Sequence, residues 1–321
     1  MRRLWRAREF GTLLILLLEI AFFAWYLWPQ GGRSHPFLNW NNAVLILKYS
    51  SIYGIAAIGA AMIIISGGID LAPGAVIALS GVVTGRFFIE GGHSLAVSLI
   101  AGLLVGLISG LLTSALVVLV HLPPFIATLG VMGVARGLAF ITTEGRYFDF
   151  SGKLPPNWKP AGIPLDWIPP LVMVLLALLF QILMKNFQWG RSVYALGGNE
   201  TAALFSGIRV GRVKTLVYTI GGLLSAMSGV VLVLVQGQGK ADIATGYELD
   251  IIASAVVGGA SLAGGRGSVA GAVLGTLIFG VLRNALPQIQ GATFYDRLIV
   301  GVVVIVIVVM DQLIARRSAP V

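Results

Sequence analysis

Side chains that could carry enzyme chemistry are few in this chain and are poorly spaced for it. A zinc protease needs two histidines one helical turn apart with a glutamate, but His35, His93 and His121 are scattered along the sequence. The chain has 0 cysteines, which removes disulfides, thiolate metal sites and a thiol nucleophile together. Ser261 lacks the second glycine of a nucleophile elbow, and the stretch ending at Lys240 lacks the spacing of a phosphate-binding loop. The sequence therefore predicts a protein without a catalytic site, a metal site or an ATPase site of its own.

Three ionisable residues adjoin or interrupt long apolar runs, where a charge is costly and calls for a function. Asp70 lies in a Gly/Pro break at residues 66–74, similar to the unwound segments by which transporters line substrate routes. The competing role for Asp70 is the N-cap of the helix that follows, and Asp250 opens another apolar run in the same fashion. Arg136 falls midway through a run and needs a buried partner or a water-filled face, and pairing inside the bundle is the favoured expectation.

The apolar runs that must position these residues dominate the composition. Hydrophobic residues make up 57% of the chain, charged residues 11%, and the mean hydropathy is +0.92, which is typical of an integral membrane protein. A spanning helix needs about 20 apolar residues to cross a core of about 30 Å. About ten such runs can be marked: 11–28, 43–65, 71–89, 94–120, 125–143, 168–184, 214–236, 249–264, 268–286 and 294–313. We therefore expect an all-α polytopic membrane protein that forms a single domain over residues 1–321.

The positive net charge of +9 reports orientation in the membrane rather than a nucleic-acid partner, because its distribution follows the loops. With the amino terminus inside, the inside loops carry most of the basic residues: Arg2, Arg3, Arg6, Arg8, Lys185, Arg191, Arg209, Arg212, Lys214, Arg266, Arg316 and Arg317. The outside loops carry only Arg33, Arg146, Lys153, Lys159 and Lys240. Both termini are predicted to be cytoplasmic. The run 11–28 is expected to remain as a span, since it ends in bulky aromatic residues where a signal peptide would have small ones.

Glycine spacing predicts where the helices pack closely. Glycines recur every four residues at 102, 106 and 110 and at 267, 271 and 275, and two more stand at 133 and 137. Such small faces let helix backbones approach in lipid. A weak internal symmetry accompanies them, because residues 53–70 and 218–250 each lead from a glycine-rich span into a turn with an acidic residue. On the predicted topology the two stretches point opposite ways, which is typical of the inverted repeats of transporters.

The longest polar interruption is residues 190–214, which combines basic flanks with a short helical pattern at residues 201–206 before Gly207. Leu204 and Phe205 would give this helix an apolar face for a partner protein. The alternative is a surface helix that lies on the bilayer, because basic flanks also suit anionic headgroups.

Four separated motifs occur in a fixed order along most of the chain from Tyr53 onward. They are SGGIDL at 66–71, PPFIATLG at 123–130 with ARGL at 135–138, YALGGNE at 194–200, and GYELD at 246–250 running on to GGASLAGGRG at 258–267. With these motifs the chain resembles the permease subunits of ribose-type monosaccharide ABC importers. Each motif is weak alone, and the four at these separations are specific.

The resemblance implies an inverted-repeat, type II-like ABC importer permease of about ten transmembrane helices in the bacterial inner membrane. Such a permease pairs with a second copy or a sister permease, receives solute from a periplasmic solute-binding protein, and is driven by cytoplasmic ATP-binding subunits that use ATP and Mg. This chain would bind no cofactor and would do no covalent chemistry. The loop 190–214 would contain the coupling helix, with these residues at the ATPase: Gly198, Asn199, Glu200, Ala202, Leu204 and Phe205. The candidates for the pathway or gate are Asp70, Arg136, Tyr247, Glu248 and Asp250.

Two segments depart from the family pattern, and two other classes of protein stay open. Residues 72–74 read Ala-Pro-Gly where relatives commonly have Ser-Val-Gly, and the outer loop 144–167 matches no family pattern. Neither segment identifies the solute. A branched-chain amino acid permease is the nearest alternative. A stand-alone carrier or membrane enzyme is more distant, since a carrier usually places more ionisable groups inside its spans.

Overall fold

The computed structural model describes residues 2–29, 35–150, 152–153 and 160–291, with a few positions between 295 and 309. The longer helices are α1 (Arg2–Tyr26), α2 (Trp40–Ile65), α3 (Pro73–Gly85), α4 (Leu95–Val118), α5 (Pro124–Thr143), α6 (Ile168–Asn186), α7 (Gln188–Gly198), α9 (Val210–Gln236), α10 (Tyr247–Val257) and α11 (Val269–Ala285). The shorter elements are a π-helical turn (Arg86–Glu90), β1 (Tyr147–Asp149), 3-10 turns (Pro160–Gly162, Leu165–Trp167 and Leu286–Gln288), α8 (Glu200–Phe205) and β2 (Gln238–Lys240).

The predicted all-α polytopic fold is confirmed, but the count of ten spans is not. Among the described residues, eight helices are long and apolar enough to cross a membrane. The predicted span 249–264 is not a continuous helix, because α10 has 11 residues and is therefore only about 16 Å long. Its C-terminal end runs into a turn at Gly258 and Gly259. The predicted span 294–313 lies largely outside the described residues.

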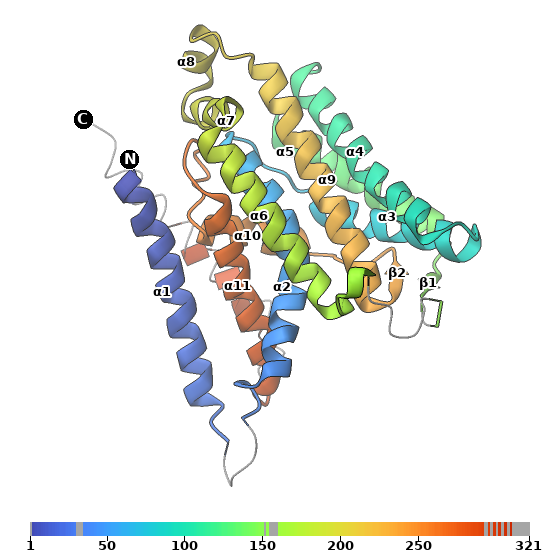
Figure 1. The fold of residues 1–321 in the computed structure, drawn as a ribbon. Helices are drawn as coiled ribbons and strands as arrows, with labels where there is room; N and C mark the ends of the chain where they lie inside the picture. The colour runs from blue at the N-terminus through green and yellow to red at the C-terminus, as the bar shows by residue number, and fades with distance from the viewer. Residues whose placement is uncertain are drawn as a thin grey trace.

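Helix α9 packs against α2, α3 and α4, and Figure 1 shows it beside α3 and α4. Ser80 of α3 joins three of these helices. Its hydroxyl is fully buried and lies 2.9 Å from the carbonyl oxygens of both Gly102 in α4 and Ala226 in α9. A hydroxyl in an apolar bundle must find such an acceptor, so this contact also fixes the register of the three helices.

The predicted close packing of helices at glycines is confirmed for two of the three glycine sets, the one at 102–110 and the one at 267–275. A Cβ atom on Gly106 would collide with the backbone of Gly222 in α9, and one on Gly275 would meet the carbonyl of Ser254 in α10. The glycines of α5 make no such close contact, since a Cβ on Gly133 or Gly137 would meet nothing within 4 Å. The expectation of a close contact within the chain is therefore wrong for α5, whose glycines lie on the exposed side of the bundle.

The predicted internal symmetry has a structural counterpart. Helix α2 has 26 residues and leads through a non-helical break into the short helix α3, while α9 has 27 residues and leads through residues 237–246 into α10. Helix α2 ends near α7, whereas α9 begins near α8 and runs away from it (Figure 1). The two helix-break-helix units therefore run in opposite directions, as an inverted repeat requires.

The two ends of the bundle differ in character. In Figure 1 the amino terminus, α7, α8 and the beginning of α9 lie at one end, and the end of α1 and the start of α2 lie at the other. We call the first the α7–α8 end and the second the far end. The short antiparallel pair of β1 and β2, in which Phe148 is opposite Gly239, lies away from the α7–α8 end.

Replacing Gly106 with alanine tests whether close packing of α4 on α9 holds the bundle together. The Gly106→Ala variant should lose about 1–3 kcal/mol of stability, because the backbone of α9 cannot move aside cheaply. Gly133→Ala, the matched control in another helix, should be neutral or gain roughly 1 kcal/mol from better helix propensity. Thermal unfolding of the two purified variants in detergent measures the difference, and equal unfolding temperatures would contradict the packing argument.

Candidate functional site

The predicted short helix in the polar loop is present as α8, Glu200–Phe205, within one residue of its expected bounds. Asn199 is its N-cap, since the Asn199 Oδ1 accepts a hydrogen bond from the Ala202 amide at 2.9 Å. Such a cap satisfies one of the amides that a helix start leaves unpaired. The short helix is therefore fixed at its first turn by one of the residues predicted to function there.

A second helix in the same loop, α7, was not expected from the sequence. Its 11 residues run from Gln188 to Gly198 and bury Gly190, Val193 and Leu196 against the bundle. These positions recur every three residues, which is a weak helical signal that the three glycines of the segment obscure. The polar loop is thus a pair of consecutive helices, α7 and α8, that lies across the end of the bundle (Figure 1).

The outward side of this helix pair combines an apolar tip with an ion pair. Leu204 is 58% exposed, and Phe205, at 85%, is the most exposed large apolar side chain among the described residues. The Glu200 carboxylate pairs with the Lys214 ammonium at 2.7 Å and so connects α8 to the first turns of α9. The predicted residue Ala202 is also exposed, and a Cβ added to Gly198 would meet nothing within 4 Å. This arrangement suits the docking of another protein.

The inward side of α7 contacts two non-helical segments of the bundle, one after α2 and one before α11. A Cβ on Gly197 would lie 2.6 Å from the Gly265 amide nitrogen and would collide with the Ile65 carbonyl at the end of α2. Gly265 itself donates a hydrogen bond to the Ile65 carbonyl at 2.8 Å. The Tyr194 hydroxyl donates to the Gly267 carbonyl at 3.0 Å, and burial raises the pKa of Tyr194 to about 12, which keeps it a donor. Helix α7 therefore touches both the end of α2 and the segment that leads into α11.

Asp70 does not cap α3, which corrects the competing expectation. The N-cap position is Ala72, without a side-chain hydrogen bond, and the Asp70 Oδ1 accepts from the Ala72 amide at 2.9 Å. This is the local turn in which an aspartate bonds the backbone two residues on. Asp70 is 7% exposed, and desolvation raises its pKa from 3.8 to about 6 against the opposing effect of the Ala72 hydrogen bond.

Asp250 is not a cap either, because α10 begins at Tyr247 with Gly246 as its N-cap. Its carboxylate is buried and pairs with the Arg283 guanidinium of α11 at 2.7 Å. Tyr247 of the same turn lies against Tyr53 of α2, with ring centroids 4.4 Å apart. The structure thus brings two predicted residues, Tyr247 and Asp250, into one cluster with two that were not predicted.

Arg136 and Glu248 belong to a separate cluster. The Arg136 Nη1 donates to the carbonyl oxygens of Ala241 at 2.6 Å and Ile243 at 2.8 Å, so the expected partner inside the bundle is backbone. Glu248 and Asp242 are the acidic groups that interact with the Arg136 charge. The Glu248 carboxylate also lies against Gly74 in the first turn of α3, where the helix dipole favours an anion.

Several ionisable residues inside the spans were not singled out from the sequence, among them Arg283, Lys48 and Glu19. Arg283 is in the last turn of α11, Lys48 of α2 pairs with Asp166 at 2.6 Å, and Glu19 of α1 has a buried oxygen without a hydrogen-bond partner among the described residues. A search for charged residues within each predicted span would have found all three. Within the described part of the chain, no group of three or more His, Cys, Asp or Glu residues could hold a metal ion.

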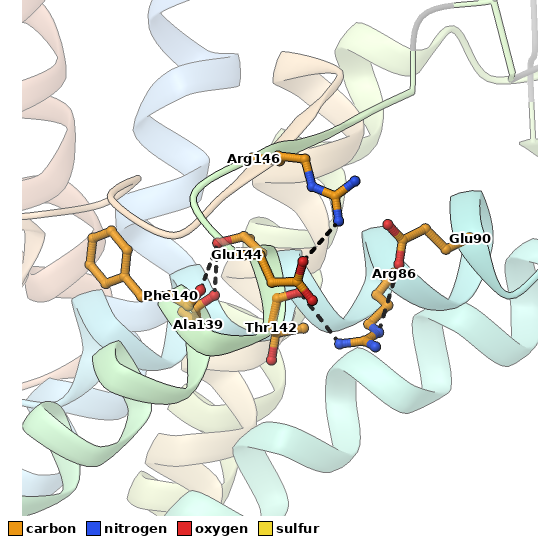
Figure 2. Close-up of polar contacts among 8 residues, drawn as sticks. Arg86, Glu90, Ala139, Phe140, Thr142, Glu144 and Arg146 are labelled. Atoms are coloured by element: carbon orange, nitrogen blue, oxygen red, sulfur yellow. Dashed lines mark hydrogen bonds and ion pairs between the residues drawn. The ribbon is translucent and has the colours of Figure 1, made fainter.

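Charged residues also meet where α5 ends (Figure 2). Arg86 lies 3.8 Å from Glu90 and donates to the Thr142 carbonyl at 3.4 Å, and Arg146 lies 3.2 Å from Glu144. All four charged side chains are well exposed, so each pair contributes at most about 1 kcal/mol. The cluster forms a polar rim that joins the end of α5 to the π-helical turn after α3.

Paired glycine variants test the contact beneath α7. Gly197→Ala should lower the unfolding temperature, since the added methyl group must displace backbone of Ile65 or Gly265, at a cost of about 1–3 kcal/mol. Gly198→Ala should leave the unfolding temperature unchanged, because a Cβ there meets nothing within 4 Å. Thermal unfolding of both purified variants measures this, and a Gly197→Ala protein as stable as Gly198→Ala would show that α7 does not pack as described.

The pKa of Asp70 predicts a pH dependence of stability. Because burial disfavours the ionised form, the folded protein holds the Asp70 proton more tightly than the unfolded chain does. Its contribution to stability is present below pH 3.8 and is lost as the pH rises through about 6. The free energy of unfolding of Asp70→Asn at pH 7.5 should therefore exceed that of the parent by about 2–3 kcal/mol. Unfolding temperatures between pH 4 and 7.5 check this, and parallel curves for parent and variant would contradict it.

Comparison with known proteins places the whole arrangement in a family. The model of the family described as "Branched-chain amino acid transport system / permease component" matches residues 42–308. The ribose import permease protein of Bacillus subtilis is 38% identical over 288 residues, which cover 88% of this chain and 87% of that protein. The D-allose transport system permease protein of Escherichia coli is 34% identical over 315 residues, 96% of this chain and 93% of that protein.

A third relative, the fructose import permease protein of Rhizobium meliloti, is 32% identical over 319 residues, covering 96% of this chain and 86% of that protein. No solved structure matches the chain. The similarity includes the non-helical segments after α2 and α9, the α7–α8 pair, and α10 and α11. The chain is therefore a multi-pass membrane protein that belongs to this family of transport permease components, as its resemblance to the ribose-type permeases implied.

Proposed function

We propose that this chain is the membrane permease subunit of an ABC importer that carries a monosaccharide across the bacterial inner membrane. The observation that carries the proposal is the α7–α8 helix pair, which presents an exposed apolar tip outward and contacts two breaks of the bundle inward. A transported solute needs no covalent chemistry from such a subunit. Relatives that share most of their length with this chain are ribose, allose and fructose permeases, which favours a sugar over a branched-chain amino acid.

The α7–α8 pair would be the docking element for a cytoplasmic ATP-binding subunit, which would use ATP and Mg. Leu204 and Phe205 would enter an apolar hollow of that subunit, while Asn199 and the pair of Glu200 with Lys214 keep α8 in position. A displacement of α7 would reach the end of α2 through Gly197 and the start of α11 through Tyr194. The interior would then open alternately to the two sides of the membrane.

This role orients the chain in the membrane. Docking of a cytoplasmic ATPase makes the α7–α8 end the cytoplasmic side, and the amino terminus lies at that same end in Figure 1. The far end and the polar rim of Figure 2 would then face the periplasm and a solute-binding protein. A second permease, either another copy of this chain or a sister subunit, would complete the translocation path. The carboxyl terminus, predicted to be cytoplasmic, lies outside the described residues.

Purification and transport assays test the proposal directly. The chain should copurify from its native membranes in mild detergent with a near-stoichiometric ATP-binding subunit. With its solute-binding protein, the complex in lipid vesicles should take up radiolabelled D-ribose, D-allose or D-fructose only when ATP is supplied on the α7–α8 side. L-leucine is the comparison solute. Uptake of leucine alone would favour the branched-chain amino acid alternative, and uptake without ATP or an ATPase would show a stand-alone carrier.

The same assay with two phenylalanine variants tests the docking role of α8. Phe205→Ala should weaken ATPase binding by about 2 kcal/mol or more, roughly thirty-fold, as expected for a buried aromatic residue at the centre of an interface. Phe140→Ala is the matched control, since this phenylalanine is 49% exposed but lies in the last turns of α5. Undiminished copurification of the ATPase with Phe205→Ala would contradict the docking role.

A further inference from the structure

A cavity of about 400 Å³ opens in the half of the bundle away from α7 and α8. Its walls are the first half of α2, the first turn of α10 and the last turn of α11. Its size falls within the roughly 300–1,000 Å³ of small-molecule sites. The side chains that line it and carry polar groups are Tyr49, Ser50, Tyr53, Tyr247, Arg283 and Asn284. The wall also includes Leu45, Ile46 and Ile52, so it is mixed, and its polar side suits water or a solute better than lipid.

Arg283 is held so that its guanidinium faces this cavity. The Asp250 carboxylate, 4% exposed, pairs with one end of the guanidinium at 2.7 Å, while Arg283 remains 29% exposed. The guanidinium also lies over the Tyr53 ring, 5.5 Å from its centroid, and its Nη1 is 3.4 Å from the Tyr53 hydroxyl. Tyr247 completes the cluster by packing on Tyr53. The cluster therefore presents two aromatic rings and a fixed donor group at one place.

The charge balance of this cluster indicates a neutral ligand. Asp250 compensates the charge of Arg283, so the lining attracts neither an anion nor a cation strongly. A free amino acid would need two separated charges of opposite sign and an apolar pocket for its side chain. A monosaccharide instead offers hydroxyl groups to the guanidinium and the tyrosine hydroxyls, and carbon-bound hydrogens to the ring faces.

Two further residues of the wall have different roles. The Ser50 hydroxyl is buried without a hydrogen-bond partner among the described residues and rests against Gly280 of α11. Because this oxygen is buried against α11, Ser50 closes the wall and offers no hydrogen bond to a ligand. Asn284 is already bonded to Asn42 and Gln288, so it shapes the wall without offering its amide to a ligand.

We propose that Tyr53, Tyr247 and Arg283, positioned by Asp250, form a subsite that binds a neutral monosaccharide in the half of the permease away from α7 and α8. The proposal rests on the proposed importer function and adds the residues that recognise the sugar inside the membrane. The Tyr247 ring would stack on one face of the sugar, since the Tyr53 ring is already covered by Tyr247 and the guanidinium, and the guanidinium and the Tyr53 hydroxyl would bond the sugar hydroxyl groups. Asp250 is a positioning residue, since its carboxylate is occupied by Arg283.

The complete importer in lipid vesicles, with its ATPase and binding protein, provides the test. The probes are radiolabelled D-ribose, D-allose and D-fructose, together with single-deoxy analogues of whichever sugar the parent protein transports. Tyr53→Phe and Arg283→Lys should each reduce maximal uptake of the parent sugar about tenfold, as expected for losing a hydrogen bond that involves a charged group. Tyr26→Phe, the same change on α1, should leave uptake unchanged.

The ratio of uptake of the sugar to uptake of its analogue distinguishes a residue that binds the ligand from one that only supports the fold. For the analogue that lacks the bonded hydroxyl, the variants should lose far less uptake, whereas a purely structural defect would lower uptake of all probes equally. The binding protein is identical in every vesicle, so its own selectivity cancels in this comparison. Equal losses for all probes, or no loss at all, would overturn the subsite.

If the single variants fold poorly, the charge-exchanged double variant Asp250→Arg with Arg283→Asp replaces them in the test. It should restore the unfolding temperature but not the uptake, and restored uptake would mean that the pair only ties α10 to α11. The importer function has a separate readout, because it fails when the parent complex transports none of the sugars with ATP, and the subsite fails with it. If the parent transports sugar and the variants match Tyr26→Phe, only the subsite fails.

Discussion

Every backbone amide and carbonyl inside a lipid bilayer must find a partner within the protein, and this constraint governs each place where the chain leaves the helix inside its bundle. After α2, the amides of Gly67 and Gly68 turn back to carbonyls of the last helical turn, and the remaining Ile65 carbonyl accepts from Gly265. In the segment 237–246, the Arg136 guanidinium serves the same purpose by bonding two carbonyls. A charged residue in the middle of a span thus replaces the hydrogen bonds that a helix would have made.

The requirement that breaks be buried against protein also explains the position of α7. The end of α2 and the turn before α11 meet through glycines, because only residues without a Cβ let two backbones come this close. Helix α7 adds Gly197 to the same contact, so three segments far apart in sequence share one small volume. A shift in the backbone of any one of these segments therefore requires the other two to move.

The sequence was sufficient for the fold class, for most helix bounds and for the short helix α8, because long apolar runs and a capping residue are local signals. It was not sufficient for α10, whose apolar pattern continues to residue 264 although the helix ends at Val257. Hydrophobicity cannot show that a run is divided between a short helix and a buried turn. The roles of Asp70 and Asp250 were also misjudged as helix caps, since the choice between a cap, a local turn and an ion pair depends on Arg283 and other residues distant in sequence.

The two helices that form the long walls of the cavity, α2 and α11, both adjoin segments that α7 contacts. Helix α2 ends at Ile65 beneath Gly197 and carries Ser50 and Tyr53 three to four turns earlier. Helix α11 begins just after Gly267, which accepts from Tyr194, and carries Arg283 in its last turn. A helix transmits displacement along its axis because its hydrogen bonds resist compression, so a movement of α7 reaches both walls through unbroken helix. The connection is a contiguous chain of packed contacts between the proposed docking surface and the cavity, along which coupling of the two sites would pass.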